Sequence, residues 1–187
     1  DKAIGYIKQA LGIDLKVYGK EHPSVAIDYN NLGSAYSKKG EYDKAIEIYD
    51  KALELDKSYK LAYYNKGIVR RSLGDYENAI ADFTQALAID DQYVEAYNNR
   101  GRVFADMENY QAAMQDYHHA ISIKPDYKIA YNNRGIAKAA LGNYVGAISD
   151  YDKAINLAPQ YKSAYNNRGL AKTALFDYAG AIEDYDI

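Results

Sequence analysis

Five asparagines recur at a fixed interval of 34 residues and are the side chains of this chain best suited to bind a ligand. They are Asn31, Asn65, Asn99, Asn133 and Asn167. A carboxamide carries two N–H donors and one carbonyl acceptor, so it can bond the main chain of a peptide without selecting its side chains. Repeated evenly, these amides predict a ladder that grips an extended peptide. Alternatively, they bond neighbouring helices and hold the structure together, and both roles are compatible with the pattern.

Two further columns with the same period pair cations with aspartates. The first column runs Leu32, Lys66, Arg100, Arg134 and Arg168, and the second runs Ile48, Asp82, Asp116, Asp150 and Asp184. The apolar member of one column corresponds to the apolar member of the other, and every cation corresponds to an aspartate. This covariation predicts an ion pair in each of the last four 34-residue repeats. We interpret these pairs as structural.

Pairs of helices must position these columns. Tyr29, Gly33 and Tyr36 follow helical spacing, Gly40 interrupts the pattern, and a second helical stripe follows with Ala45, Tyr49 and Ala52. The turn glycine recurs as Gly74 and Gly142, whereas Glu108 and Phe176 replace it in two units. Because a left-handed backbone conformation costs little only for glycine, we expect strained or altered turns at those two positions.

A glycine also recurs in the middle of each first helix, where it costs roughly 1 kcal/mol relative to alanine. These glycines are Gly33, Gly67, Gly101, Gly135 and Gly169. We expect the small alanine pairs of the second helices, such as Ala45 and Ala52, to face them and to let the two backbones approach closely. The aromatic residues Tyr49, Phe83, Tyr117, Tyr151 and Tyr185 would then fill the flanks of this contact.

The order Tyr-x2-Leu-Gly-x2-Tyr at 29–36, followed by Ala-x3-Tyr-x2-Ala at 45–52 and by prolines after later second helices, resembles the tetratricopeptide repeat. The resemblance covers nearly the whole chain. It implies an all-α, right-handed superhelical solenoid of antiparallel helix pairs, with the first helices lining a concave groove. The longer link at 15–23, with Glu-His-Pro before the next helix, resembles the first repeats of kinesin light chains.

The period divides the chain into six segments that together form one solenoid domain. Residues 1–25 hold the second helix of a truncated repeat and the long link, residues 26–59, 60–93, 94–127 and 128–161 are full repeats, and residues 162–187 are a partial repeat.

Side chains on the groove face would select the peptide. Cations predominate in the N-terminal half, with Lys38, Arg71 and Arg102, although Glu95 and Asp106 intervene. Apolar residues predominate in the C-terminal half, with Ile129, Ile136 and Leu170. We therefore expect a peptide whose acidic part meets the first half and whose apolar side chains meet the second. The cationic clamp of receptors for chaperone tails is missing, which argues against that class of partner.

Several functions are disfavoured by composition. The net charge is −3 with both signs interspersed, so there is no basic stripe for nucleic acid. Cysteine is absent, and the adjacent His118 and His119 diverge by about 100° on a helix, so we expect no metal site and no cofactor. No catalytic motif and no membrane-spanning apolar run occurs. We expect a cytoplasmic protein and read the chain as a piece of a longer one.

The sequence thus favours a non-catalytic protein–protein interaction scaffold that binds a peptide segment. A substrate-docking arm of a larger enzyme is the alternative suggested by the resemblance of the asparagine ladder to that of O-GlcNAc transferase. A third hypothesis is self-association, because the truncated repeats at the two ends of the chain should expose apolar surface that could stack end to end.

Overall fold

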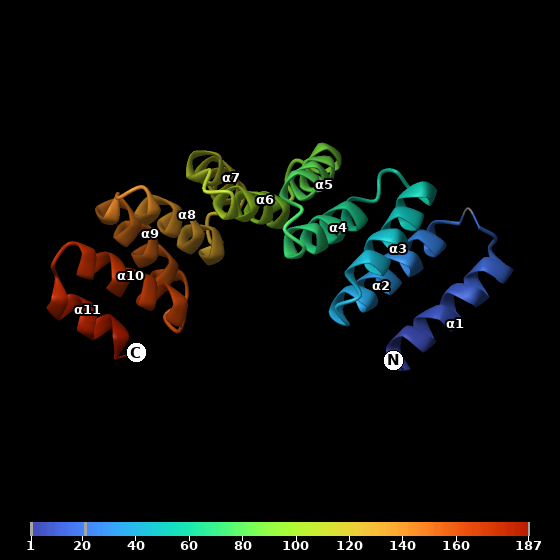
Figure 1. Ribbon diagram of the computed structural model, residues 1–187, viewed down its shortest axis with the longest axis horizontal. Helices are drawn as coiled ribbons and strands as arrows, with labels where there is room; N and C mark the ends of the chain where they lie inside the picture. Colours follow the sequence, from blue (N-terminus) through green and yellow to red (C-terminus); the bar gives the residue numbers. More distant parts are fainter. Residues whose placement is uncertain (1, 21, 187) are drawn as a thin grey trace. The chain divides into compact units, whose positions relative to one another are not determined.

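The structure is a computed structural model that describes residues 2–20 and 22–186, and every regular element in that part of the chain is an α-helix (Figure 1). The elements are α1 (Lys2–Val17), α2 (Pro23–Lys38), α3 (Tyr42–Leu55), α4 (Lys60–Ser72), α5 (Tyr76–Ile89), α6 (Val94–Asp106), α7 (Tyr110–Ile123), α8 (Lys128–Ala140), α9 (Tyr144–Leu157), α10 (Lys162–Ala174) and α11 (Tyr178–Tyr185). The predicted all-α architecture is therefore confirmed. Glu21, part of the predicted long link, lies outside the described residues.

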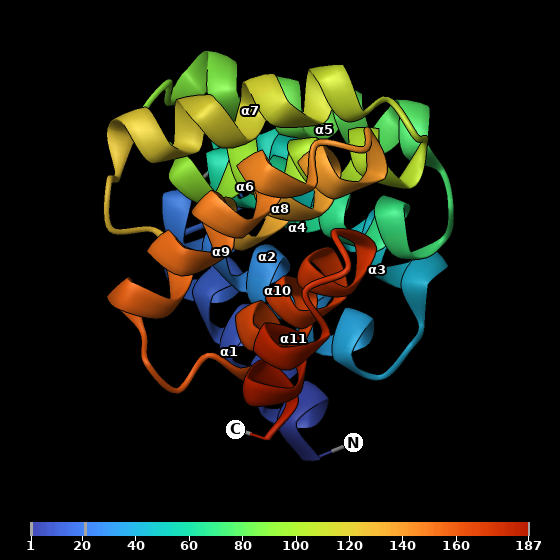
Figure 2. The same ribbon diagram turned by 90° about the vertical axis from the view of Figure 1, so that its left-hand side faces the viewer.

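The helices pack as hairpins in which a first helix lies against the second helix that follows it. The hairpins are α2–α3, α4–α5, α6–α7, α8–α9 and α10–α11, and the two helices of each lie side by side in both views (Figure 1, Figure 2). α1 packs against α2.

Two compact units are formed along the chain. Unit 1 extends to Asp91 and contains α1 to α5, and unit 2 starts at Gln92 and contains α6 to α11. Within unit 1 the first helices α2 and α4 are neighbours, and within unit 2 α6 neighbours α8 and α8 neighbours α10. Successive hairpins in each unit therefore bring the same face of their first helices next to one another.

Local sequence sets the ends of the helices. Pro23 occupies the first turn of α2, where its missing N–H costs nothing, and Nδ1 of His22 accepts a hydrogen bond from the Ser24 N–H at 3.2 Å. The turn glycines adopt positive φ angles, for example 81° at Gly40. Glu108 and Phe176 adopt the same left-handed conformation, with φ angles of 58° and 64°, so the predicted strain at these two turns is present.

The core of each hairpin is an aromatic ring seated on a glycine. A Cβ atom added at Gly135 would lie 2.5 Å from Cε1 of Tyr151, and one added at Gly33 would lie 2.6 Å from Cε1 of Tyr49. This corrects the expectation that the rings fill the flanks of the contact, because they lie on the glycines themselves. The expectation that alanines face the glycines holds at Gly101, where an added Cβ would lie 3.2 Å from the main-chain oxygen of Ala113. The ring takes the space of the absent Cβ, while the alanines of the second helix, such as Ala45, are fully buried beside it.

Within residues 2–20 and 22–186, no helix has both the length and the apolar character needed to cross a bilayer.

Candidate interaction surface

The asparagine column lies along the first helices, one residue on each. Asn31 is on α2, Asn65 on α4, Asn99 on α6, Asn133 on α8 and Asn167 on α10. Asn31 is exposed, and the other four are half-buried. The neighbouring first helices of each unit therefore carry their amides at matching positions.

Three of these amides link one first helix to the previous one. Nδ2 of Asn65 donates to Oδ1 of Asn30, Nδ2 of Asn133 to Oδ1 of Asn98, and Nδ2 of Asn167 to Oδ1 of Asn132, each at 2.9 Å. The acceptors Asn30, Asn98 and Asn132 are buried, at 6%, 3% and 4% exposure. The sequence did not single out these acceptors, although they share the 34-residue period and stand one place before the ladder.

Asn99 differs from the other members of the column. The residue 35 places before it is Tyr64 and not an asparagine. Nδ2 of Asn99 instead donates to the main-chain oxygen of Glu95 at 2.9 Å, and its Oδ1 accepts from Nη1 of Arg102 at 3.3 Å. In Asn65, Asn133 and Asn167, by contrast, no described residue donates to the carbonyl oxygen of the side chain.

Apolar side chains flank the asparagines in unit 2. Ile129, Asn133 and Ile136 occur at i, i+4 and i+7 on α8, so they share one face of that helix. Ile129 is 37% exposed, Ile136 is 43% exposed, and Leu170 on α10 is 57% exposed. Three large apolar side chains thus remain in water next to amides that have an acceptor to offer.

The three predicted groove cations lie in different surroundings. Lys38 at the end of α2 and Arg102 on α6 are exposed, whereas Arg71 on α4 is half-buried. Arg102 also holds the amide of Asn99, as described above.

The structure brings together each cation with its aspartate. Nζ of Lys66 lies 3.3 Å from Oδ1 of Asp82. The three arginines meet their carboxylates through two N–H groups, with the Nε to Oδ2 distance 2.9 Å in each case. These pairs are Arg100–Asp116, Arg134–Asp150 and Arg168–Asp184. The aspartates are nearly buried, at 3% to 4% exposure, so the pairs lie inside the hairpins.

A second cation reaches three of the four aspartates from one helical turn further on. Nη1 of Arg70 lies 2.9 Å from Asp82, Nζ of Lys138 lies 2.7 Å from Asp150, and Nζ of Lys172 lies 2.9 Å from Asp184. The repeat with Asp116 has Phe104 at this position. These cations recur at the 34-residue period, so the sequence contained a third column that could have predicted them.

The environment of each aspartate decides the direction of its pKa shift. Burial raises the pKa of Asp82 more than Lys66 and Arg70 lower it. Burial also acts on Asp184, but there the hydrogen bonds from Arg168 and Lys172 outweigh it and lower the pKa. Hydrogen bonds to Asp116 and Asp150 raise the pKa of Arg100 and Arg134, so these guanidinium groups stay charged.

Nothing in the described part of the chain assembles a metal site: residues 2–20 and 22–186 contain no cluster of three or more histidine, aspartate or glutamate side chains that could hold an ion. The rings of His118 and His119 are 6.4 Å apart and steeply inclined, and His119 stacks on Tyr97 at 5.3 Å. The histidines therefore pack on the surface of α7 as aromatic groups.

Family models described as tetratricopeptide repeat match the chain at residues 1–58, 48–81, 94–127 and 129–161. A further model, described as TPR repeat, matches residues 67–108. No curated protein matches it. Among solved structures, the crystal structure of MamA protein is 26% identical, with a TM-score of 0.75, and the match covers 86% of this chain and 88% of that one.

YrrB, described as a TPR protein with an unusual peptide-binding site, is also 26% identical. Its TM-score is 0.73, and the match covers 95% of this chain and 89% of YrrB. The pilF protein of Pseudomonas aeruginosa is 23% identical with a TM-score of 0.79, over 86% of this chain and 73% of that one, and shows likeness of fold alone.

Proposed function

The chain belongs to the tetratricopeptide repeat family, and we propose on that basis that it is a non-catalytic scaffold that binds an extended peptide along the first helices of its hairpins. The observation that carries this proposal is the surface of α8 and α10 in unit 2. There, the exposed side chains of Ile129, Ile136 and Leu170 adjoin Asn133 and Asn167. The likeness to YrrB, a peptide-binding TPR protein, supports the same function.

The amides of Asn133 and Asn167 are suited to receive main-chain N–H groups. Each donates through Nδ2 to an asparagine of the preceding first helix, which fixes the orientation of the carboxamide plane. The carbonyl oxygen is then held in place before a ligand arrives, and little conformational entropy is lost on binding. The two roles foreseen for the ladder, holding the stack and gripping a peptide, use different atoms of one side chain.

Apolar peptide side chains would lie against Ile129, Ile136 and Leu170, because burying this exposed surface is the main source of favourable free energy available there. Acidic side chains of a peptide on unit 2 would meet Arg102, and those of a peptide on unit 1 would meet Lys38 and Arg71. Of the ladder residues, Asn99 contributes least to peptide binding, since both ends of its amide are engaged within α6.

A matched pair of substitutions in unit 2 tests the proposal. Peptides are selected from a random phage-displayed library on the wild-type chain, and their affinities are then measured for Ile136→Asp and for Ile182→Asp. Both isoleucines are exposed, at 43% and 61%, but Ile182 lies on the second helix α11. We expect Ile136→Asp to weaken binding by about tenfold or more, since a carboxylate placed in an apolar contact must be desolvated without a partner.

Ile182→Asp should leave the affinity unchanged. Charge reversal by Arg102→Glu should weaken only those selected peptides that carry acidic residues. Selection of no peptide at all, or equal affinity for Ile136→Asp and Ile182→Asp, would contradict a peptide groove on the first helices.

A further inference from the structure

Asn133 and Ile136 on α8 recur as Asn167 and Leu170 on α10, so the two helices carry the same pair of groups at matching positions. In both pairs the amide stands three residues before the apolar side chain, which places the two groups on one face of the helix. Ile136 is 43% exposed and Leu170 is 57% exposed. Each of these first helices therefore offers one hydrogen-bond acceptor and one apolar contact.

The pair on α8 stays accessible although α8 has a first helix on either side of it. α8 contacts both α6 and α10, yet Ile136 is exposed and Oδ1 of Asn133 receives no hydrogen bond from a described residue. The bonds to the neighbouring helices use other atoms: Nδ2 of Asn133 donates to Asn98, and Oδ1 of Asn132 accepts from Asn167. Stacking of the repeats thus leaves the carbonyl oxygen and the apolar side chain for a ligand.

The distance between neighbouring first helices sets the interval at which these groups repeat. Cα atoms of α8 and α10 come within 8 Å of each other, and the amides of Asn132 and Asn167 are joined at 2.9 Å. Helices packed in this way have axes about 8–10 Å apart. Because Asn133 and Asn167 occupy matching positions, their carbonyl oxygens repeat at about the same interval of 8–10 Å, and so do the side chains of Ile136 and Leu170.

This interval distinguishes between two forms of extended peptide. In a β-strand, N–H groups on the same side recur every second residue, at about 6.8 Å, and the next one follows at about 13.6 Å. In a polyproline II helix three residues complete one turn of about 9.3 Å, so every third N–H group has the same direction. Only the polyproline II interval falls within the spacing of the two helices. A strand would reach one of the two amides and miss the other.

We propose that unit 2 binds a peptide segment in the polyproline II conformation, with one period of three residues for each hairpin. The inference rests on the proposed function, since it assigns the conformation and the sequence period of the same peptide. In each period one residue directs its N–H group to Asn133 or Asn167, so it is not proline. A second residue is apolar and contacts Ile136 or Leu170. The third can be proline, which favours the polyproline II conformation.

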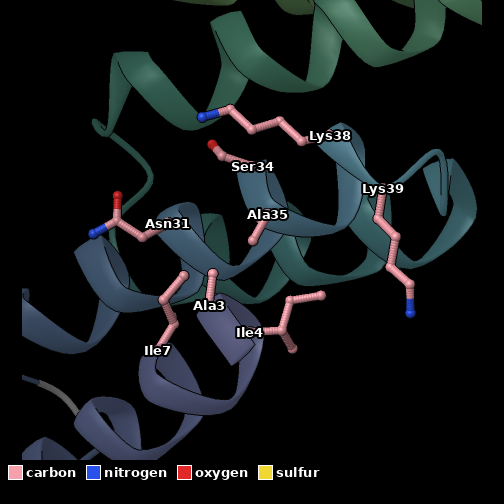
Figure 3. A pocket seen from close by; sticks show the side chains of 8 residues that line it. All are labelled: Ala3, Ile4, Ile7, Asn31, Ser34, Ala35, Lys38 and Lys39. Carbon is pink, nitrogen blue, oxygen red and sulfur yellow. The ribbon is translucent and has the colours of Figure 1, made fainter. Parts of the chain in front are cut away.

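Unit 1 does not carry the same pair on both of its first helices. On α2 the position of Ile136 is occupied by Ser34, which lies with Asn31 and Lys38 on one wall of a pocket of about 600 Å³ (Figure 3). The isoleucines of that pocket belong to α1. α2 therefore presents a hydroxyl group where α8 presents an isoleucine, and a ligand with an apolar side chain in every period fits unit 2.

Two synthetic peptides of nine residues test the period. The first is three repeats of Ala-Leu-Pro. The second has proline at every second position, with leucine and alanine between, so that any two residues three apart include one proline. Each peptide carries fluorescein, and its affinity for the whole chain is measured by fluorescence anisotropy. We expect the first peptide to bind at least about fivefold more tightly, because a proline facing the ladder removes an N–H group that one amide needs.

Methylation of the peptide nitrogens gives an independent check. The alanine nitrogens and the leucine nitrogens of the first peptide are methylated in separate peptides. One set should weaken binding by about fivefold or more and the other should not, because only one N–H group in each period faces the ladder. The loss should be smaller in Asn167→Ala, which lacks one of the two acceptors, and unchanged in Asn99→Ala, whose amide is engaged within α6. The comparison of the peptides on wild type does not depend on the folding of either variant.

Equal affinity for the two peptides, tighter binding of the alternating one, or no binding of either would overturn the three-residue period. Equal losses from the two methylated sets would overturn it as well. The peptides selected from the phage library separate this outcome from failure of the groove itself. If the selected peptides bind and lose affinity with Ile136→Asp while the Ala-Leu-Pro peptide does not bind, the groove stands and its polyproline II period is wrong.

Discussion

Replacing Arg100 by leucine should destabilise the fold more than the same replacement of Arg134. Both arginines hold a nearly buried aspartate through two N–H groups, Asp116 and Asp150 respectively. Asp150 has a second cation, with Nζ of Lys138 2.7 Å from its Oδ2. Asp116 has no second cation among the described residues, so Arg100→Leu leaves a buried carboxylate with no charged partner.

The structure sets the size of the difference. Removing one partner of a buried pair costs roughly 3–5 kcal/mol, which we expect for Arg100→Leu because the Asp116 side chain is only 5% exposed. Arg134→Leu loses one of two charged hydrogen-bonding partners, and such a bond contributes about 1.5–3 kcal/mol. The expected gap between the two variants is therefore about 2 kcal/mol.

The chain also provides the compensated variant. In the first full hairpin, Leu32 and Ile48 occupy these two positions and lie in one hydrophobic cluster. The double variant with Arg100→Leu and Asp116→Ile should therefore have a free energy of unfolding within about 1 kcal/mol of that of wild type, since replacing a buried ion pair by packed apolar residues is often neutral.

The free energies of unfolding of these variants are compared by urea unfolding, followed by circular dichroism. A shift of the urea midpoint reports a change in stability when the dependence of the unfolding free energy on urea concentration is the same in each variant. Strictly additive losses in the double variant, or equal losses for Arg100→Leu and Arg134→Leu, would refute the reasoning. The first result would mean that the pairs are not coupled, and the second that the second cation contributes nothing.

Four further substitutions follow from the backbone and burial, each checked by thermal or urea unfolding. Gly135→Ala should destabilise by about 1–3 kcal/mol, because its Cβ would lie 2.5 Å from the Tyr151 ring, whereas Gly12→Ala on α1, where nothing lies within 4 Å, should stabilise by up to about 1 kcal/mol. Glu108→Gly should stabilise by about 1 kcal/mol, because it relieves a φ angle of 58°; no change would mean that the turn is unstrained. Asp28→Asn should stabilise at neutral pH, because burial and then a neighbouring carboxylate raise the pKa of Asp28. The raised pKa makes the charged form unfavourable in the folded state, so this advantage should vanish as the pH falls below the ordinary pKa of 3.8; an advantage independent of pH would contradict it.

Much of the fold could be predicted from residue types at fixed intervals. Helical spacing and the recurring turn glycines defined the hairpins, because residues three to four apart lie on the same face of a helix whatever surrounds it. The link between Arg134 and Asp150 was visible as covariation, since an unpaired buried charge costs too much for one column to change without the other.

The candidate site could be predicted only in part. Spacing placed Asn133 and Ile136 on one face of a helix, but the bond from Asn133 to Asn98 depends on how two first helices approach each other. The second cation, Lys138, was missed for a different reason: its column was visible in the sequence at the same period, but it was not compared with the aspartate column.

By itself, the sequence determined the repeat, the paired helices and the residue types of each column, because these follow from local periodicity along one chain. Apart from the cation–aspartate pairs, only the tertiary structure decided what each column touches. It seated the Tyr151 ring on Gly135, joined Asn133 to Asn98 and left Ile136 exposed. The physical reason is that hydrogen bonds and close packing are sensitive to differences of a few tenths of an ångström in the distance between two helices. The spacing of residues along the sequence does not contain that distance.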